Sequence, residues 1–308
     1  MTQFFGYWGG SLPPVTNLHF RSFIHFHPNS KYDLWLDADV GQSIPSDLNW
    51  LKTHPQINIR VFSLKQLVSR YVTPLTQKAD GGLFDALRFI HRKKILRHIN
   101  LKNYYSPLFK LNYKHSSPLF TYQYDLTYRA DLVRCIIPVA HYDGPSLYAD
   151  LDVCFLSDLN SICMHQGFVY RWEDYDFANS AILYSPSNKV AEQILDAGNQ
   201  AECFRPWYLF TDKICTRLNL KIYPTNLFDA MWDPKSLLAG DALKFFKKTD
   251  QSVAMVEELF EKKYIVNHWH NNWRTIPETG SPYDLLLNHF LHNNQLTTAS
   301  HNFFNTSG

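Results

Sequence analysis

The stretch "SLYADLDVCFLSDL" (Ser146–Leu159) decides how the fold of this chain is interpreted. Its first residues form an apolar run typical of a buried strand, but Asp150 and Asp152 appear where that run should continue. Burying a charged carboxylate without a partner is costly. The stretch therefore predicts a strand that ends in two carboxylates, whose charge a metal ion or a basic side chain must offset.

Two carboxylates at this spacing can face one cation. Residues i and i+2 of an extended chain point to the same side, so Asp150 and Asp152 share a face. Mg²⁺ and Mn²⁺ favour oxygen ligands, and open α/β sheets bind ligands at the carboxyl ends of their strands. We therefore expect a divalent metal site here. A helix cap or an arginine partner is the alternative.

The Asp-x-Asp pattern by itself is weak evidence, because it occurs three times in the chain. Asp37-Ala-Asp39 also closes a predicted strand, but Ser, Pro and Asp follow within a few residues, which favours a turn. The third occurrence is Asp174-Tyr-Asp176. Context favours Asp150 and Asp152 as the metal-binding pair, because they lie between the apolar runs "SLYA" and "VCFL".

The remainder of the chain alternates strands with helices. Apolar periodicity predicts strands at 2–10 and 32–39, a strand running into a helix at 57–68, and helices at 15–28, 128–144, 188–200 and 252–263. This alternation favours an α/β fold with a mixed, mostly parallel sheet flanked by helices. We expect a single domain over residues 1–308, with a Tyr-rich insertion at 103–124 and a flexible tail at 297–308.

Composition narrows the class of function. The net charge of +2, from 30 basic and 28 acidic residues, gives no sign of a nucleic-acid partner. Five cysteines without CxxC spacing argue against a disulfide framework or a structural zinc site. We find no signal peptide and no apolar run long enough to span a membrane, so we expect a cytoplasmic protein.

One segment suggests contact with a membrane. Residues 81–103 predict a helix on which arginine and lysine side chains crowd onto one face. A solvated helix face is the simpler interpretation. The alternative is peripheral contact with anionic lipid at the inner membrane face, or with an acidic acceptor.

The region "ADLVRCIIPVAHYDGPSLYADLDVCFLSDL" resembles the sugar-binding region of metal-dependent GT-A glycosyltransferases. The similarity is to glycosyltransferase family 32, the group with mannosyltransferase-like and capsular polysaccharide enzymes, and more distantly to the large clostridial glucosylating toxins. The family pattern is an Asp-x-x-Arg helix, a short loop and a strand ending in Tyr-x-Asp-x-Asp. The matching residues here are Asp131, Arg134, Tyr148, Asp150 and Asp152.

Two further segments agree with this resemblance. "FGYWGGSLPP" and the strand "YDLWLDAD" resemble the family's opening strand and turn, and "VNHWHNNW" resembles its closing segment. One departure is "HYDGPSLYAD", where Pro145 stands in place of the second glycine found in many relatives. The resemblance implies a GT-A type, Rossmann-like fold.

The resemblance also implies roles for individual residues. Asp150 and Asp152 would bind Mn²⁺ or Mg²⁺, with His268 as a further ligand and His270 as the competing choice. Asn179 would face the donor sugar or the acceptor, and Asp174 and Asp176 the acceptor. The donor nucleotide-sugar would contact Trp8, Gly9, Asp131, Arg134, Tyr148 and Trp273.

Several of these roles have plain structural alternatives. Asp131 and Arg134 are spaced for an i,i+3 ion pair on one helix face. Trp8 would stack on uracil, which implies a UDP-sugar, but it is equally a core residue at a strand end. Trp273 would close over the diphosphate, and a core position is the alternative.

The implied function is a metal-dependent, retaining glycosyltransferase. It would move a hexose from a nucleotide-sugar, most simply a UDP-hexose, to a glycan or lipid-linked glycan in surface polysaccharide synthesis. Two alternatives remain open: a toxin-like enzyme that glycosylates a protein, and a binding module that keeps the nucleotide-sugar pocket without turnover. A metal-dependent phosphohydrolase would usually need more clustered ligands around two metals.

Overall fold

The computed structural model describes residues 2–72, 126–163, 166–172, 175–201, 203–270 and 272–292. The predictions made for the basic segment 81–103, the insertion 103–124, Asp174 and the tail 297–308 lie outside these ranges. No helix of the described ranges is both long and apolar enough to cross a membrane.

A seven-stranded sheet forms the centre of the fold, in the order β10-β8-β9-β6-β1-β3-β5. β9 runs antiparallel to both of its neighbours, and each other neighbouring pair in this sheet is parallel. The predicted mixed, mostly parallel sheet is therefore confirmed. Its strands are β1 (Gln3–Trp8), β3 (Tyr32–Asp37), β5 (Ile57–Phe62), β6 (Ser146–Ala149), β8 (Phe168–Arg171), β9 (Asn179–Ser185) and β10 (Lys221–Pro224).

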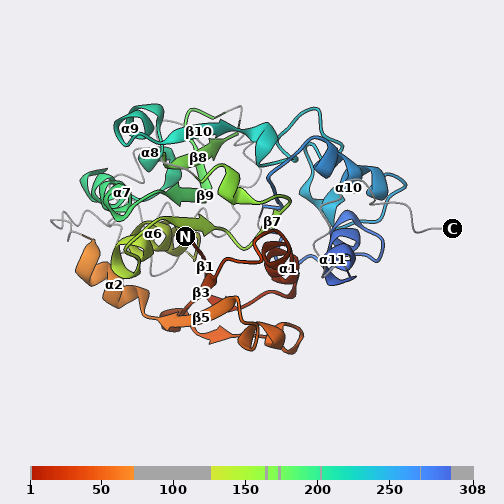
Figure 1. Ribbon diagram of the computed structural model, residues 1–308, viewed down its shortest axis with the longest axis horizontal. Helices are drawn as coiled ribbons and strands as arrows, with labels where there is room; N and C mark the ends of the chain where they lie inside the picture. Colours follow the sequence, from red (N-terminus) through yellow and green to blue (C-terminus); the bar gives the residue numbers. More distant parts are fainter. Residues whose placement is uncertain are drawn as a thin grey trace, which may run out of the picture.

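Helices cover both sides of this sheet, as predicted. Figure 1 shows α2, α6 and α7 on one side and α1, α10 and α11 on the other. The α-helices are α1 (Asn17–Phe26), α2 (Leu64–Tyr71), α6 (Leu126–His141), α7 (Asn188–Ala201), α8 (Pro206–Leu209), α9 (Asp212–Arg217), α10 (Ser252–Glu261) and α11 (Pro282–His292).

Short elements connect these parts. Two small sheets pair β2 (Gly10–Ser11) with β4 (Gln42–Ser43) and β7 (Val153–Phe155) with β11 (Val266–His268). The 3-10 helices are η1 (Pro14–Thr16), η2 (Ala38–Val40), η3 (Ser46–Lys52), η4 (Leu159–Ser161), η5 (Thr225–Leu227) and η6 (Ala242–Phe245).

The helix predicted at 128–144 ends earlier, at His141. Gly144 and Pro145 follow it, and both residue types are poor helix formers. Pro145, the departure from the family pattern, keeps the chain paired at this turn, because its carbonyl accepts a hydrogen bond of 2.9 Å from the Gln3 amide. The substitution therefore leaves the start of β6 attached to β1.

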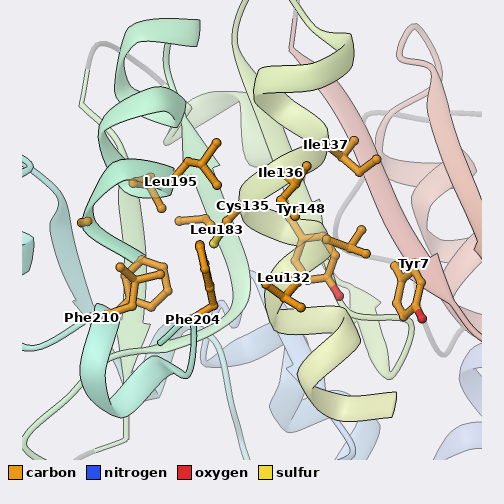
Figure 2. Packing of buried hydrophobic residues seen from close by; sticks show 14 of the residues in the cluster. Tyr7, Leu132, Cys135, Ile136, Ile137, Tyr148, Leu183, Leu195, Phe204 and Phe210 are labelled. Atoms are coloured by element: carbon orange, nitrogen blue, oxygen red, sulfur yellow. The ribbon is translucent and has the colours of Figure 1, made fainter. Parts of the chain in front are cut away.

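Apolar side chains fill both faces of the sheet. On one face, α6 and α7 pack through residues such as Leu132, Ile136 and Leu195 against Tyr148 and Leu183 (Figure 2). Each fully buried side chain of this kind contributes roughly 1.5–3 kcal/mol of hydrophobic free energy. A second cluster on the other face includes side chains of α1, β1 and β3. The two clusters fix the strands from both sides.

The topology brings polar residues from distant segments to one edge of the sheet. β1, β3, β6, β8 and β10 end at this edge, and the antiparallel β9 begins there, since Ala149 pairs with Ile182. The residues at or just beyond these strand ends are Trp8, Gly9, Asp37, Asp150, Asp152, Trp172, Asn179 and Asp229.

Candidate active site

Asp150 lies directly after β6 and is held on three sides. Its amide donates a hydrogen bond of 2.8 Å to the Ala181 carbonyl of β9. Its Oδ1 accepts a hydrogen bond from the Tyr148 hydroxyl and one of 3.2 Å from Nη2 of Arg134. The side chain is 23% exposed. The arginine partner considered from the sequence is thus present, and part of the side chain remains exposed.

Asp152 is more deeply buried, with a side chain only 3% exposed. It precedes β7, which pairs with β11 so that His268 lies opposite Val153. The Trp269 amide donates to the Asp152 carbonyl at 2.9 Å, which ties the two chain segments together beside the carboxylate. As a result, Nε2 of His268 lies 3.2 Å from Oδ1 of Asp152.

Burial and charge oppose each other at His268. Burial favours the neutral imidazole, but the carboxylates of Asp152, Asp229 and Asp150 outweigh it and raise the pKa of His268 to about 9. Burial raises the pKa of Asp150, and the charge of Arg134 opposes that rise. In the absence of a metal ion, the imidazolium therefore offsets part of the carboxylate charge.

Asp150, Asp152 and His268 form a group suited to a cation. One ligand atom from each residue lies within 4.8 Å of the others. The residues predicted from the sequence as metal ligands are thus brought together, and their binding of a metal stays a prediction. Two carboxylates with an imidazole favour Mn²⁺ over Mg²⁺, because Mg²⁺ prefers oxygen ligands alone.

A second group of this kind includes His270, the competing choice from the sequence, with His268 and Asp229. Nε2 of His270 donates to Oδ2 of Asp229 at 2.7 Å, and the His268 and His270 rings lie 3.9 Å apart. Burial, followed by the charge of His268, lowers the pKa of His270.

Sequence reasoning missed Asp229. It lies just beyond η5, and its carboxylate is completely buried. Nε1 of Trp172 also donates to its Oδ2, at 2.9 Å. No local motif marks this aspartate, because its partners come from the residue after β8 and from the segment after β11. The strand order alone brings them together.

Asp131 and Arg134 form a buried ion-pair network on α6. Nη2 of Arg134 lies 3.4 Å from Asp131, which confirms the i,i+3 pair, and Nη1 of Arg205 lies 3.0 Å from the same carboxylate. Burial raises the pKa of Asp131 to about 6 against the opposing charges of Arg134 and Arg205. Arg134 thus links this network to Asp150. A contact of either residue with a donor sugar stays a prediction.

Tyr148 and Asn179 are buried behind the carboxylates. The Tyr148 ring lies under the Arg134 guanidinium, 4.7 Å from ring centre to Cζ. The Asn179 amide donates to the Tyr170 hydroxyl at 2.8 Å and accepts from the Ala181 amide at 2.9 Å. The Tyr170 hydroxyl lies 2.9 Å from Nδ1 of His268. In this arrangement, Tyr148 holds Asp150, and Asn179 holds the Tyr170 hydroxyl that contacts His268.

The two tryptophans predicted to contact the donor meet each other. The ring centres of Trp8 and Trp273 lie 4.6 Å apart in an edge-to-face arrangement, and both side chains are half-buried. Stacking of either ring on a nucleotide base stays a prediction. Packing within the protein is enough to explain a glycine at position 9, because a Cβ there would lie 2.9 Å from the Tyr7 hydroxyl and from Val40.

The other described Asp-x-Asp pair, Asp37 and Asp39, forms a turn, as predicted. Oδ1 of Asp37 accepts the Asp39 amide at 3.0 Å and caps η2. Oδ2 of Asp37 accepts hydrogen bonds from the Tyr7 hydroxyl, at 2.9 Å, and from Nε of Arg129, at 2.7 Å. This carboxylate is thus occupied by protein partners.

Comparison with known proteins yields only structural similarity. No family model matches the chain, and no curated protein matches it. The chain is similar to the solved structure of the galactosyltransferase LgtC with donor and acceptor sugar analogues: 10% identity, 96% of this chain and 98% of that chain covered, TM-score 0.40.

Two further solved structures are similar over most of this chain. The bifunctional glycosyltransferase WbbM is 9% identical, with 95% of this chain and 50% of that chain covered and a TM-score of 0.45. Mouse xyloside xylosyltransferase 1 is 7% identical, with 88% and 99% covered and a TM-score of 0.37. All three are glycosyltransferases by name.

Proposed function

We propose that this protein is a metal-dependent GT-A glycosyltransferase of the family 32 type, which transfers a hexose from a UDP-sugar to a glycan acceptor. The observation that supports this most is the group of Asp150, Asp152 and His268 beyond the end of β6. Three side chains from two separate segments converge there, at the edge where α/β sheets bind ligands.

The ligand atoms that these three side chains offer support binding of Mn²⁺. Asp150 and Asp152 supply carboxylate oxygens, and His268 supplies an imidazole nitrogen. When bound, the ion would act as a Lewis acid that offsets negative charge on the departing nucleoside diphosphate. The part of Asp150 that faces outward leaves room for such a ligand on the open side of the group.

The surrounding residues keep these ligands in position. Arg134 and the Tyr148 hydroxyl orient Asp150, and the Tyr170 hydroxyl, itself held by Asn179, orients His268. Ligands fixed by hydrogen-bonding neighbours do not have to reorganise during the reaction.

The donor would lie on the β1 side of Asp150, Asp152 and His268, which we call the metal-binding group. Trp8 would stack on the uracil, and Asp131 and Arg134 would contact sugar hydroxyls or phosphate. Transfer would retain the anomeric configuration by a front-face route, which requires no strong side-chain base. The acceptor would be a growing surface glycan, with Trp273 closing over the diphosphate.

Hydrolysis of a panel of nucleotide-sugars by the purified protein tests this function. Slow release of one nucleotide in the presence of Mn²⁺, abolished by EDTA and by Asp152→Ala, is the expected result. Electron paramagnetic resonance of added Mn²⁺ gives a second measurement that does not depend on turnover. Binding of a donor without turnover would instead support a non-catalytic module, and binding of neither donor nor Mn²⁺ would overturn the proposal.

A further inference from the structure

Three aromatic side chains lie together beyond the ends of β8 and β10. The ring centres of Trp172, Tyr175 and Trp232 are 5.1–5.6 Å apart, and the two indoles are stacked with an interplanar angle of 20°. All three side chains are half-buried, so part of each remains accessible. We call these three residues the aromatic surface.

The aromatic surface is continuous with the metal-binding group. Nε1 of Trp172 donates to Oδ2 of Asp229 at 2.9 Å, and that carboxylate also accepts from His270. The His270 ring lies 5.4 Å from Trp172 and 3.9 Å from the ring of His268. An unbroken series of contacts thus joins the aromatic surface to the side chain of Asp152.

The backbone at this junction is held in an uncommon conformation. His270 has a φ of +49°, in the left-handed region that residues other than glycine rarely adopt. Such conformations persist where the surrounding structure enforces them. Here the hydrogen bond to Asp229 fixes the His270 imidazole, which places a polar group beside the aromatic surface.

The strand order separates the aromatic surface from the proposed nucleotide side. In the order β8-β9-β6-β1, the carboxylates follow β6, and Trp8 follows β1. β8 is three strands from β1, which at 4.7–4.9 Å per strand amounts to about 14 Å. A nucleotide near Trp8 would therefore leave the aromatic surface free for a second ligand on the other side of the metal-binding group.

We propose that the aromatic surface binds a pyranose ring of a glycan acceptor, with His270, which the buried Asp229 holds in place, beside the acceptor hydroxyls. This inference rests on the proposed function and names the class of its acceptor. A pyranose has apolar C–H faces and polar edges, so it matches half-buried aromatic rings next to a partly exposed imidazole.

Trp232 allows a direct test, because Trp232→Ala removes one ring of the aromatic surface and Trp232→Phe keeps a flat ring. Transfer from a radiolabelled UDP-hexose is measured with methyl glycosides of glucose, galactose, mannose and N-acetylglucosamine, and with short Ser/Thr/Tyr peptides. We expect transfer to one glycoside by the unchanged chain. In Trp232→Ala, the ratio of transfer to donor hydrolysis should fall about tenfold, with a raised acceptor KM. Trp232→Phe should recover most of that ratio.

Trp50→Ala provides a matched control. Trp50 is also half-buried, but it lies on η3 against Arg21, away from the aromatic surface. This variant should keep both the transfer ratio and the acceptor KM. Thermal unfolding of each variant separates loss of the acceptor site from loss of the fold.

Two results would overturn the inference while leaving the proposed function intact. One is donor hydrolysis with an unchanged transfer ratio in folded Trp232→Ala, and the other is transfer to peptides alone. If the unchanged chain neither hydrolyses a donor nor transfers from one, the proposed function fails, and the acceptor assignment fails with it.

Discussion

Two Asp-x-Asp pairs lie at the ends of parallel strands on either side of β1, at the same edge of the sheet, yet they have different surroundings. Asp37 ends β3 and Asp39 follows it, and Asp150 and Asp152 lie after β6. Each pair has one buried side chain and one side chain that is 23% exposed. The motif and its position in the sheet are therefore not what distinguishes them.

The difference lies in the partners that reach each pair from elsewhere in the chain. Asp37 accepts two donors of the Arg129 guanidinium, and Asp39 accepts the Ser63 hydroxyl and the Lys65 amide at the start of α2. These protein donors use most of the acceptor capacity of both carboxylates. The pair therefore has a structural role, and none of these partners is a histidine.

The second pair has a histidine among its partners. His268 reaches Asp152 through the pairing of β7 with β11. Because Asp39 and Asp150 are equally exposed, the approach of His268 is what distinguishes the second pair as the candidate metal site. Variants of the two pairs should therefore differ in stability, in turnover and in Mn²⁺ binding.

Removal of Asp37 should cost the most stability. Asp37→Ala leaves the buried Arg129 guanidinium without its main partner, which typically costs about 3–5 kcal/mol of unfolding free energy. Urea denaturation measures the change. The double variant Asp37→Ala/Arg129→Met should recover part of the loss, because it removes the unpaired charge. An unchanged urea midpoint for Asp37→Ala would show that the pair does not hold this edge together.

Removal of Asp152 should act mainly on turnover. Asp152→Ala deletes one proposed metal ligand, and we expect donor hydrolysis to fall by at least about 100-fold, the scale of losing one charge-stabilising group in an active site. Asp39→Ala is the matched control from the other pair and should keep turnover within about twofold. Equal losses in both variants would contradict the distinction between the pairs.

The two histidines should differ in their effect on Mn²⁺ binding. His268→Ala removes the imidazole that lies 3.2 Å from Asp152, and we expect the Kd for Mn²⁺ to rise about tenfold or more. His270→Ala should raise it less, because His270 contacts Asp229 instead. Isothermal titration calorimetry measures both values, with His54→Ala as the control. A larger effect of His270→Ala would place the metal in the second group.

The smallest effect is expected at Asp39. Asp39→Asn keeps the shape of the side chain but weakens its interaction with the amino end of α2, at a cost of about 0.5–1 kcal/mol. The difference in urea midpoint from the unchanged chain gives this value. A cost as large as that of Asp37→Ala would mean that the two carboxylates act as one unit around Arg129.

The sequence by itself determined the strands β1, β3, β5 and β6, the helices α1, α2, α6, α7 and α10, and one half of the candidate site. Alternation of apolar runs placed the strands and helices, because burial of one face imposes a period on the residues of each element. The run "SLYADLD" indicated that carboxylates follow a buried strand, because the cost of burying charge is a local property of the chain. The i,i+3 pair of Asp131 and Arg134 was also predictable, because residues three positions apart lie on the same face of a helix.

Only the tertiary structure decided which groups meet those carboxylates. His268 reaches Asp152 through a register between β7 and β11, and Asp229 reaches His270 from beyond the end of β10. These contacts join residues far apart in the chain, so no spacing in the sequence encodes them. The antiparallel β9 was also missed, and the folded sheet alone shows how it brings Asn179 and Tyr170 beneath His268.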